Sequence, residues 1–291
     1  MTTNITPQVT LNNGTTMPQF GLGVWQAKDG QEVKQAVLDA IAAGYRLIDT
    51  AAVYGNESGV GEAIKECGVP RNELFITTKL WNADQGDYET VNKAFETSLQ
   101  KLGLDYVDLY LIHWPVPARG KYVETWQALE RIYTDGRAKA IGVCNFKAHH
   151  LEEILKVATV TPVVNQIELH PRFPQAETRE FCDHHDIIVE SWSPIGGSGA
   201  GWGSNGEELK LLDEPVLMSI GNKYAKSPAQ VVIRWHLQNK LIVIPKSVHK
   251  ERIIENLNVF DFELDEADME AIAGLETGKR IGADPDSANF V

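Results

Sequence analysis

The feature that most constrains the fold is a regular alternation between short apolar runs rich in β-branched residues and amphipathic segments of roughly 10 to 15 residues. Eight apolar runs are expected as strands: Gly21–Trp25, Tyr45–Asp49, Leu74–Lys79, Val107–His113, Ala138–Cys144, Val163–Ile167, Ile187–Trp192 and Leu241–Pro245. Helical periodicity follows in eight segments: Gln31–Ala43, Glu57–Glu66, Glu89–Leu102, Val123–Tyr133, Ala148–Val157, Gln175–His185, Ser227–Gln238 and Lys250–Leu257. The pattern predicts repeated units of a strand followed by a helix.

Strands of continuous apolar character must be covered on both faces, which favours an α/β fold of the (β/α)8 type, a TIM barrel. A doubly wound open sheet is the alternative on pattern alone. No Pro/Ser-rich linker or block of charge divides the chain, so we expect one barrel domain over residues 1–291. A hairpin around Asn12-Asn13-Gly14 should cap the barrel, and the glycine-rich segment 195–215 should form a mobile lid or a flexible surface loop among the βα loops.

The charge balance limits the partners of such a barrel. The 27 Lys and Arg residues face 40 Asp and Glu residues, which gives a formal net charge of −13. Nucleic acids and anionic membranes are bound through basic side chains that neutralise phosphate, so neither is expected as a partner. An anionic ligand would have to be held by local positive groups against this overall field.

The cellular setting is predicted from cysteines and from the absence of targeting segments. Cys67, Cys144 and Cys182 are odd in number and far apart, which favours reduced thiols over a disulfide framework. The N-terminal sequence has no basic region followed by an apolar stretch, and no run of about 18 apolar residues occurs. These observations predict a cytoplasmic protein.

Four polar residues come at the ends of three consecutive expected strands, where barrel enzymes carry their chemistry. Asp49 closes the second strand, Tyr54 follows it in the loop, Lys79 closes the third strand and His113 closes the fourth. A nearby ammonium favours a phenolate, so Lys79 is expected to lower the pKa of Tyr54, and Asp49 to keep Lys79 charged. Tyr54 would then act as a general acid, and His113 would polarise a carbonyl by hydrogen bonding.

Several motifs resemble those of the aldo-keto reductases over essentially the whole chain. They are LIDTAAVYGNE, TTKLW, LIHWP, GVCNF, NQIELHP, SWSPIGG and IPKSVHKERIIEN. The resemblance implies a barrel that reduces aldehydes and ketones with NADPH through a tetrad of Asp49, Tyr54, Lys79 and His113. The tryptophan at position 192 is similar to that of the bacterial 2,5-diketo-D-gluconate reductase-like branch.

The same resemblance implies a set of cofactor-binding residues. They are Asn145 and Gln166 for the nicotinamide carboxamide, Trp192 for stacking on the ring, Ser193 and Ile195 for the pyrophosphate, Lys246, Ser247 and Arg252 for the 2′-phosphate, and Glu255 and Asn256 near the adenine. Two positions depart from the family pattern. Cys144 replaces a more usual Ser or Thr, and His249 stands where many relatives have Arg. We therefore expect NADPH as the preferred cofactor and NADH as a weaker alternative.

Clues to the substrate are fewer. Trp25, Trp81 and Trp114 lie at or just past expected strand ends, which predicts an aromatic-walled pocket. The segment between His113 and Val123 is short, so the pocket should be open and accept small or varied carbonyl compounds such as keto sugars, α-ketoaldehydes and keto esters. The resemblance further implies a monomer.

Two other functions are the alternatives to carbonyl reduction. One is an NADPH-binding regulatory or sensor subunit on the same fold, with little turnover. The other is a metal-dependent barrel hydrolase, which would need a His-x-His at an early strand end, and the sequence has none. The adjacent pairs His149-His150 and His184-His185 are expected on the surface, and no metal site is predicted.

Overall fold

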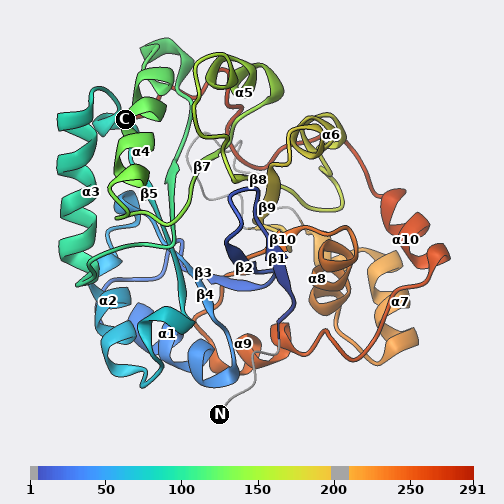
Figure 1. Ribbon diagram of the computed structural model, residues 1–291. Helices are drawn as coiled ribbons and strands as arrows, with labels where there is room; N and C mark the ends of the chain where they lie inside the picture. The colour runs from blue at the N-terminus through green and yellow to red at the C-terminus, as the bar shows by residue number, and fades with distance from the viewer. Residues whose placement is uncertain (1–5, 198–209) are drawn as a thin grey trace.

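The computed structural model describes residues 6–197 and 210–291. Its main feature is one parallel eight-stranded sheet in the order β10-β9-β8-β7-β6-β5-β4-β3, wound into a barrel (Figure 1). The strands are β3 (Gly21–Gly23), β4 (Leu47–Asp49), β5 (Phe75–Leu80), β6 (Leu109–Ile112), β7 (Ile141–Cys144), β8 (Val164–Glu168), β9 (Ile188–Trp192) and β10 (Ile242–Val243). The predicted (β/α)8 fold is confirmed.

The barrel is closed where β3 meets the last strand. Parallel bridges join Phe20 to Val243 and Gly23 to Lys246. A Cβ on Gly23 would lie 2.8 Å from the Ile244 carbonyl oxygen, so only glycine allows the two backbones to come this close. The closed form removes exposed sheet edges and brings all eight carboxyl ends of the strands to one rim.

Helices surround the strands, as predicted from their amphipathic pattern (Figure 1). They are α1 (Gln31–Ala43), α2 (Glu57–Glu66), α3 (Tyr88–Leu102), α4 (Tyr122–Thr134), α5 (Ala148–Leu155), α6 (Ala176–His184), α7 (Pro215–Tyr224), α8 (Pro228–Gln238), α9 (Lys250–Leu257) and α10 (Glu266–Ala273). The sequence reading missed α7 and α10. The first begins at Pro215, the last residue of the segment assigned to a lid, and the second is a short helix with only two buried residues, Asp268 and Ile272.

An antiparallel hairpin covers the end of the barrel opposite the carboxyl ends of the strands. It consists of β1 (Gln8–Thr10) and β2 (Thr16–Pro18), joined by the predicted Asn12-Asn13-Gly14 turn. Leu11 and Met17 are buried against the barrel interior. The Asn12 side-chain amide donates to the carbonyls of Pro162 and Asp186, which fastens the turn to the barrel. The expected cap is thus present.

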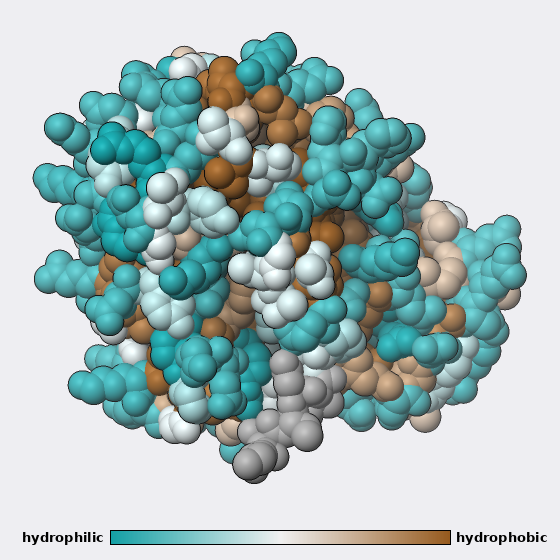
Figure 2. Space-filling view, in the orientation of Figure 1, coloured by the Kyte–Doolittle hydropathy of each residue, from teal (hydrophilic) through white to brown (hydrophobic). Residues whose placement is uncertain are grey.

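Two other expectations concern loops and surface. Most of the proposed lid, residues 198–209, lies outside the described residues. Among the helices that the structure describes, none is both long and apolar enough to cross a membrane. The face seen in Figure 2 is largely hydrophilic, with hydrophobic residues in smaller areas between the polar ones.

Candidate active site

The four predicted tetrad residues are positioned by neighbouring strands. Asp49 is the last residue of β4, Lys79 is the fifth of six residues in β5, and His113 directly follows β6. Tyr54 ends a single 3₁₀ turn (Ala52–Tyr54) just beyond β4. Because parallel strands end at the same rim, these four side chains converge although up to 64 residues separate them in the sequence (113 − 49 = 64).

Lys79 is at the centre of the group. Its Nζ lies 2.6 Å from Asp49 Oδ1, 2.9 Å from the Thr50 carbonyl oxygen and 3.3 Å from the Tyr54 hydroxyl. The Lys79 side chain is 0% exposed, so this charge is desolvated and depends on the three oxygens. The Tyr54 and His113 ring centroids are 5.7 Å apart. The structure therefore brings together the carboxylate, ammonium, phenol and imidazole that the sequence singled out.

The electrostatics of the group differ in one respect from the expectation. Burial raises the pKa of Tyr54, and this effect outweighs the opposing influence of the nearby Lys79 charge. The prediction of a net lowered Tyr54 pKa is therefore wrong, because it did not include the cost of desolvating a phenolate. Burial would lower the pKa of Lys79, but Asp49 and Tyr54 raise it above its ordinary value. Tyr54 is thus held as a phenol beside a permanently charged lysine.

His113 is kept neutral. Burial, assisted by the Lys79 charge, lowers its pKa well below the ordinary value. Asn145 Nδ2 donates to the His113 carbonyl oxygen at 3.0 Å, which fixes the backbone at this position. A neutral imidazole can donate one hydrogen bond without adding a second cation beside Lys79.

The tetrad opens into a cavity of about 330 Å³. Its lining includes Tyr54, His113, Trp25, Trp114 and Lys246. Of the three tryptophans predicted for the pocket, Trp25 and Trp114 are on the lining. Trp81 is not among the lining residues, and its ring centroid lies 5.5 Å from that of His113.

Five of the predicted cofactor residues also line this cavity: Asn145, Gln166, Trp192, Ser193 and Ile195. Trp192 Nε1 donates to Asn145 Oδ1 at 2.8 Å, so the indole and the amide orient each other. Asn145 and Ser193 have positive φ angles of 65° and 48°. Backbone strain of this kind at non-glycine residues clusters in ligand sites.

The remaining predicted cofactor residues surround the start of α9. Ser247 and Asn256 are buried, whereas Arg252 and Glu255 are exposed. The Ser247 hydroxyl oxygen accepts a hydrogen bond from the His249 backbone N–H. None of these four lies on the cavity lining, although they are close in sequence to Lys246, which does. Lys246 and Arg252 make no ion pair within residues 6–197 and 210–291, which leaves their charges available to a ligand.

These features fit a dinucleotide phosphate. Asp49, Tyr54 and His113 of the tetrad line the cavity, Asn145 and Gln166 present amides on the same lining, and Lys246 supplies a cation to it. His113 Nδ1 has no hydrogen-bond partner among the described residues, so this buried nitrogen is available to hydrogen-bond a ligand.

The sequence reading missed the contribution of the C-terminal segment. Ile281, Gly282 and Ala283 line the cavity. A Cβ on Gly282 would lie 2.6 Å from the Trp192 ring, so this wall requires a glycine. Phe290 stacks on Trp81 with centroids 6.1 Å apart. The segment lacks periodicity, so no local signal could have placed it against the pocket.

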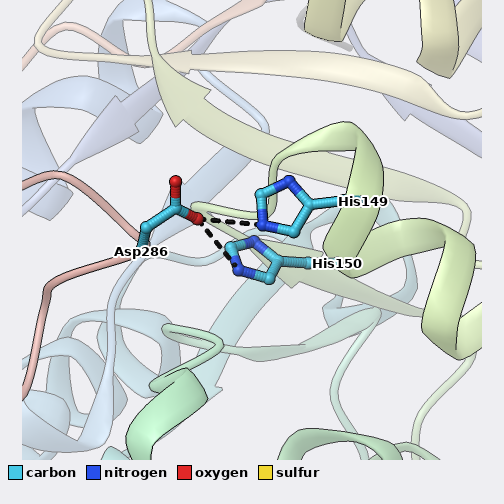
Figure 3. A group of neighbouring side chains, drawn as sticks. All are labelled: His149, His150 and Asp286. Atoms are coloured by element: carbon cyan, nitrogen blue, oxygen red, sulfur yellow. Dashed lines mark ion pairs between the residues drawn. The ribbon is translucent and has the colours of Figure 1, made fainter.

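A second missed group secures this segment. Lys147 Nζ lies 2.6 Å from both Asp284 Oδ1 and Asp286 Oδ2. His149 and His150 point toward the same Asp286 carboxylate, with Nε2 atoms 2.9 and 3.3 Å from Oδ1 (Figure 3). We call Lys147, His149, His150, Asp284 and Asp286 the tail clamp.

His150 departs from the expectation of a surface residue. It is 2% exposed, because α5 packs it beneath the C-terminal segment. Its Nδ1 accepts a hydrogen bond from the Lys147 backbone N–H, so the neutral ring carries its proton on Nε2, facing Asp286. Nε2 lies 3.3 Å from Asp286 Oδ1 but makes no hydrogen bond among the described residues, so the ring packs against this carboxylate without being bonded to it.

Comparisons with known proteins accord with this geometry. The model of the Aldo/keto reductase family matches residues 19–277. The chain is 54% identical over 279 residues to 9,11-endoperoxide prostaglandin H2 reductase of Trypanosoma cruzi (strain CL Brener), covering 96% of this chain and 95% of that protein. It is 51% identical over 290 residues to glyoxal reductase of Bacillus subtilis (strain 168), covering 100% of each.

The solved structures agree. A mutant of Gox0644 in complex with NADPH has a TM-score of 0.89 and 47% identity, covering 98% of this chain and 99% of that one. The expected family resemblance is confirmed by the matched family model, by relatives named as reductases and by the shared barrel. The chain belongs to the aldo/keto reductase family of oxidoreductases.

Proposed function

We propose that this protein uses NADPH to reduce the carbonyl group of small aldehydes and ketones, with Tyr54 as the proton donor. The observation that carries the proposal is the position of Lys79, whose Nζ joins Asp49 and Tyr54 at 2.6 and 3.3 Å beside an open cavity. The family match supports carbonyl reduction, and the NADPH complex of Gox0644 supports the choice of cofactor.

In the proposed reaction, the hydride for the carbonyl carbon would come from bound NADPH. His113 donates a hydrogen bond to the carbonyl oxygen and orients it toward Tyr54. Tyr54 then transfers its phenolic proton to that oxygen, and the adjacent Lys79 charge stabilises the phenolate left behind. Asp49 keeps Lys79 protonated and in place throughout.

The proposed cofactor contacts come from residues on the cavity lining and from residues around the start of α9. Gln166 and Asn145 would hold the carboxamide, Trp192 would pack on the ring, and Ser193 and Ile195 would lie along the pyrophosphate. Lys246, Ser247 and Arg252 would bind the 2′-phosphate, while Glu255 and Asn256 would lie near the adenine. Charge-assisted contacts to a phosphate favour NADPH over NADH, which lacks that group.

The substrate class we propose is small carbonyl compounds, with α-ketoaldehydes first. The cavity of about 330 Å³ is near the lower limit of ordinary ligand sites, and the proposed cofactor would occupy part of it, which leaves space for a small carbonyl compound. The similarity to a glyoxal reductase points in the same direction. Keto sugars and keto esters are the next compounds to test. We further propose that the chain acts as a monomer, as one barrel domain over residues 1–291.

The test compares wild type with Tyr54→Phe across aldehydes, α-ketoaldehydes, keto sugars and keto esters, with NADPH and NADH in parallel. We expect kcat to fall by about 10²- to 10⁴-fold in the variant, because it lacks the proton donor. The Kd for NADPH, measured by fluorescence quenching, should be nearly unchanged.

Tyr110→Phe is the matched control. Tyr110 is fully buried, its hydroxyl has no partner among the described residues, and it does not line the cavity. Full activity in Tyr54→Phe would remove Tyr54 as the acid. Tight NADPH binding by wild type with no turnover of any carbonyl would favour the sensor function instead.

A further inference from the structure

A buried carboxyl lies directly beneath the tetrad and has no part in the proposed proton transfer. Glu190 is in the middle of β9 and is 0% exposed. Its Oε2 accepts a hydrogen bond from Gln166 Nε2 at 2.8 Å, and the same Nε2 donates to Asp49 Oδ2 at 2.8 Å. One amide therefore joins two carboxyl groups that face the same barrel interior.

The charges in this interior do not balance if both carboxyls ionise. Two carboxyls, Asp49 and Glu190, share one ammonium, that of Lys79. Asp49 lies 2.6 Å from Lys79 Nζ and forms the ion pair. Glu190 Oε1, by contrast, has no hydrogen-bond partner among the described residues. The proton that the pair of carboxyls retains therefore belongs on Glu190.

The groups around Glu190 support this assignment. The charged or titratable neighbours are Asp49 from β4, Lys79 from β5 and Cys144 from β7. The neighbouring strands β8 and β10 contribute the Gln166 amide and Ile242, which are uncharged. Burial, and then the Asp49 charge, raise the pKa of Glu190 to about 8, against the opposing effects of Gln166 and Lys79. Burial raises the pKa of Asp49 as well, but Lys79 opposes this directly.

Gln166 also connects Glu190 to the cavity. The Gln166 side chain lines the cavity on one side and binds Glu190 on the other. A positive charge at the floor of the cavity would therefore be one side chain away from Glu190 in a dry, low-dielectric interior, where charges interact strongly. The two redox forms of the proposed cofactor differ in this charge, because the oxidised nicotinamide ring is a cation and the reduced ring is neutral.

We propose that Glu190 is a charge-compensating residue that loses its proton to solvent when NADP⁺ binds and keeps it when NADPH binds. This inference rests on the proposed function. The step is a simple dissociation, in which the carboxyl O–H bond breaks, the carboxylate keeps the electron pair and the buffer accepts the proton. Glu190 acts through Gln166 and the local field, so it is a positioning residue and not a catalytic one.

The sign of the pH effect follows from linkage. If bound NADP⁺ lowers the pKa of Glu190, NADP⁺ binding releases a proton and becomes tighter as pH rises toward the pKa of the free protein. Above that pKa, Glu190 is already ionised before NADP⁺ binds, so the affinity for NADP⁺ no longer changes with pH. NADPH carries the same phosphates, so the ratio of the two dissociation constants cancels the titration of the 2′-phosphate.

The experiment measures Kd for NADP⁺ and NADPH by fluorescence and calorimetry from pH 6 to 9 in wild type, Glu190→Gln and Glu57→Gln. In wild type, we expect Kd(NADP⁺)/Kd(NADPH) to fall by up to about tenfold per pH unit below pH 8 and to level off above it. In Glu190→Gln, which mimics the protonated acid, the ratio should be independent of pH. Glu57→Gln should behave as wild type.

Glu57 is a close control because it is also buried. One of its oxygens accepts from Thr78, and the other has no partner among the described residues, but Glu57 does not line the cavity. A ratio that does not change with pH in wild type, or that changes equally in Glu190→Gln, overturns the inference.

Proton release by wild type gives a second measurement that needs no variant. Calorimetry in buffers of different ionisation enthalpy counts the protons released per dinucleotide bound at pH 7. We expect NADP⁺ to release close to one proton more than NADPH, because the 2′-phosphate contributes equally to the two counts. Equal counts overturn the inference alone, whereas failure of both dinucleotides to bind overturns the proposed function and this inference with it.

Discussion

At the scale of single residues, the site depends on the buried Lys79 ammonium, whose charge needs a compensating partner in the barrel interior. Lys79 is entirely buried, and the carboxylate of Asp49 at 2.6 Å compensates its charge. Desolvation makes each member of such a pair costly by itself, even where the intact pair adds little net stability. The Lys79 ammonium, which Asp49 keeps charged, lies 3.3 Å from the Tyr54 hydroxyl. Its charge would stabilise the Tyr54 phenolate that forms when the phenol gives up its proton.

A double-variant cycle tests this dependence. Lys79→Met leaves Asp49 as an uncompensated buried anion, so we expect a loss of about 3–5 kcal/mol in the free energy of unfolding. Adding Asp49→Asn should recover much of that stability, because both charges are then gone. Neither variant should regain turnover, since no cation remains to stabilise the Tyr54 phenolate. Urea denaturation and kcat measure the two effects, and a Lys79→Met variant of wild-type stability would contradict the argument.

At the scale of elements, the pocket wall is a segment without regular structure that two other elements hold. On one side, Glu168 of β8 accepts hydrogen bonds from the backbone N–H groups of Ile281 and Gly282 at 2.5 and 3.0 Å. On the other, the tail clamp at the start of α5 holds the two aspartates. Within the clamp, burial lowers the pKa of His150 to about 4, so this ring is neutral near pH 7 and Lys147 is the cation that binds both aspartates.

Removing that cation should loosen the wall without disturbing the cofactor site. For Lys147→Met, we expect KM for a small aldehyde to rise by about three- to tenfold, since partly exposed ion pairs contribute modestly. The Kd for NADPH should stay the same. Lys121→Met removes a lysine whose ion pair with Glu124 is exposed, and it should leave KM unchanged. Equal shifts in both variants would indicate an effect of net charge only.

At the scale of the whole molecule, the net charge of −13 and the proposed binding of an anionic dinucleotide are compatible because local placement matters more than the sum. Exposed charges are screened beyond about 10 Å at 0.1 M salt. The ligand would therefore interact mainly with Lys246 and Arg252 at the start of α9, and the distant acidic residues would contribute little.

Variants of equal net charge separate the local effect from the global one. Arg252→Leu and Lys250→Met each change the net charge from −13 to −14, by removing one cation. Lys250 precedes Arg252 by two residues in α9, pairs with Asp39 of α1 and is not among the proposed phosphate ligands. We expect Arg252→Leu to raise Kd for NADPH by about 10- to 100-fold with little change for NADH. Lys250→Met should change neither value, and equal effects of the two would point to the overall field.

The sequence by itself determined the parts of this protein that are set by local pattern. The alternation of apolar runs and amphipathic segments predicted the eight strands and eight of the ten helices in the described residues. Because a barrel brings all carboxyl ends of its strands to one rim, the positions of Asp49, Lys79 and His113 in the sequence were enough to predict that they meet.

The tertiary structure decided what depends on burial and on distant neighbours. Desolvation reversed the expected direction of the Tyr54 pKa shift. A charged residue inside the apolar run of β9 was visible in the sequence, but only barrel closure showed that Glu190 lies one amide from Asp49. The C-terminal wall and the buried position of His150 likewise come from contacts across more than 100 residues, which no local periodicity encodes.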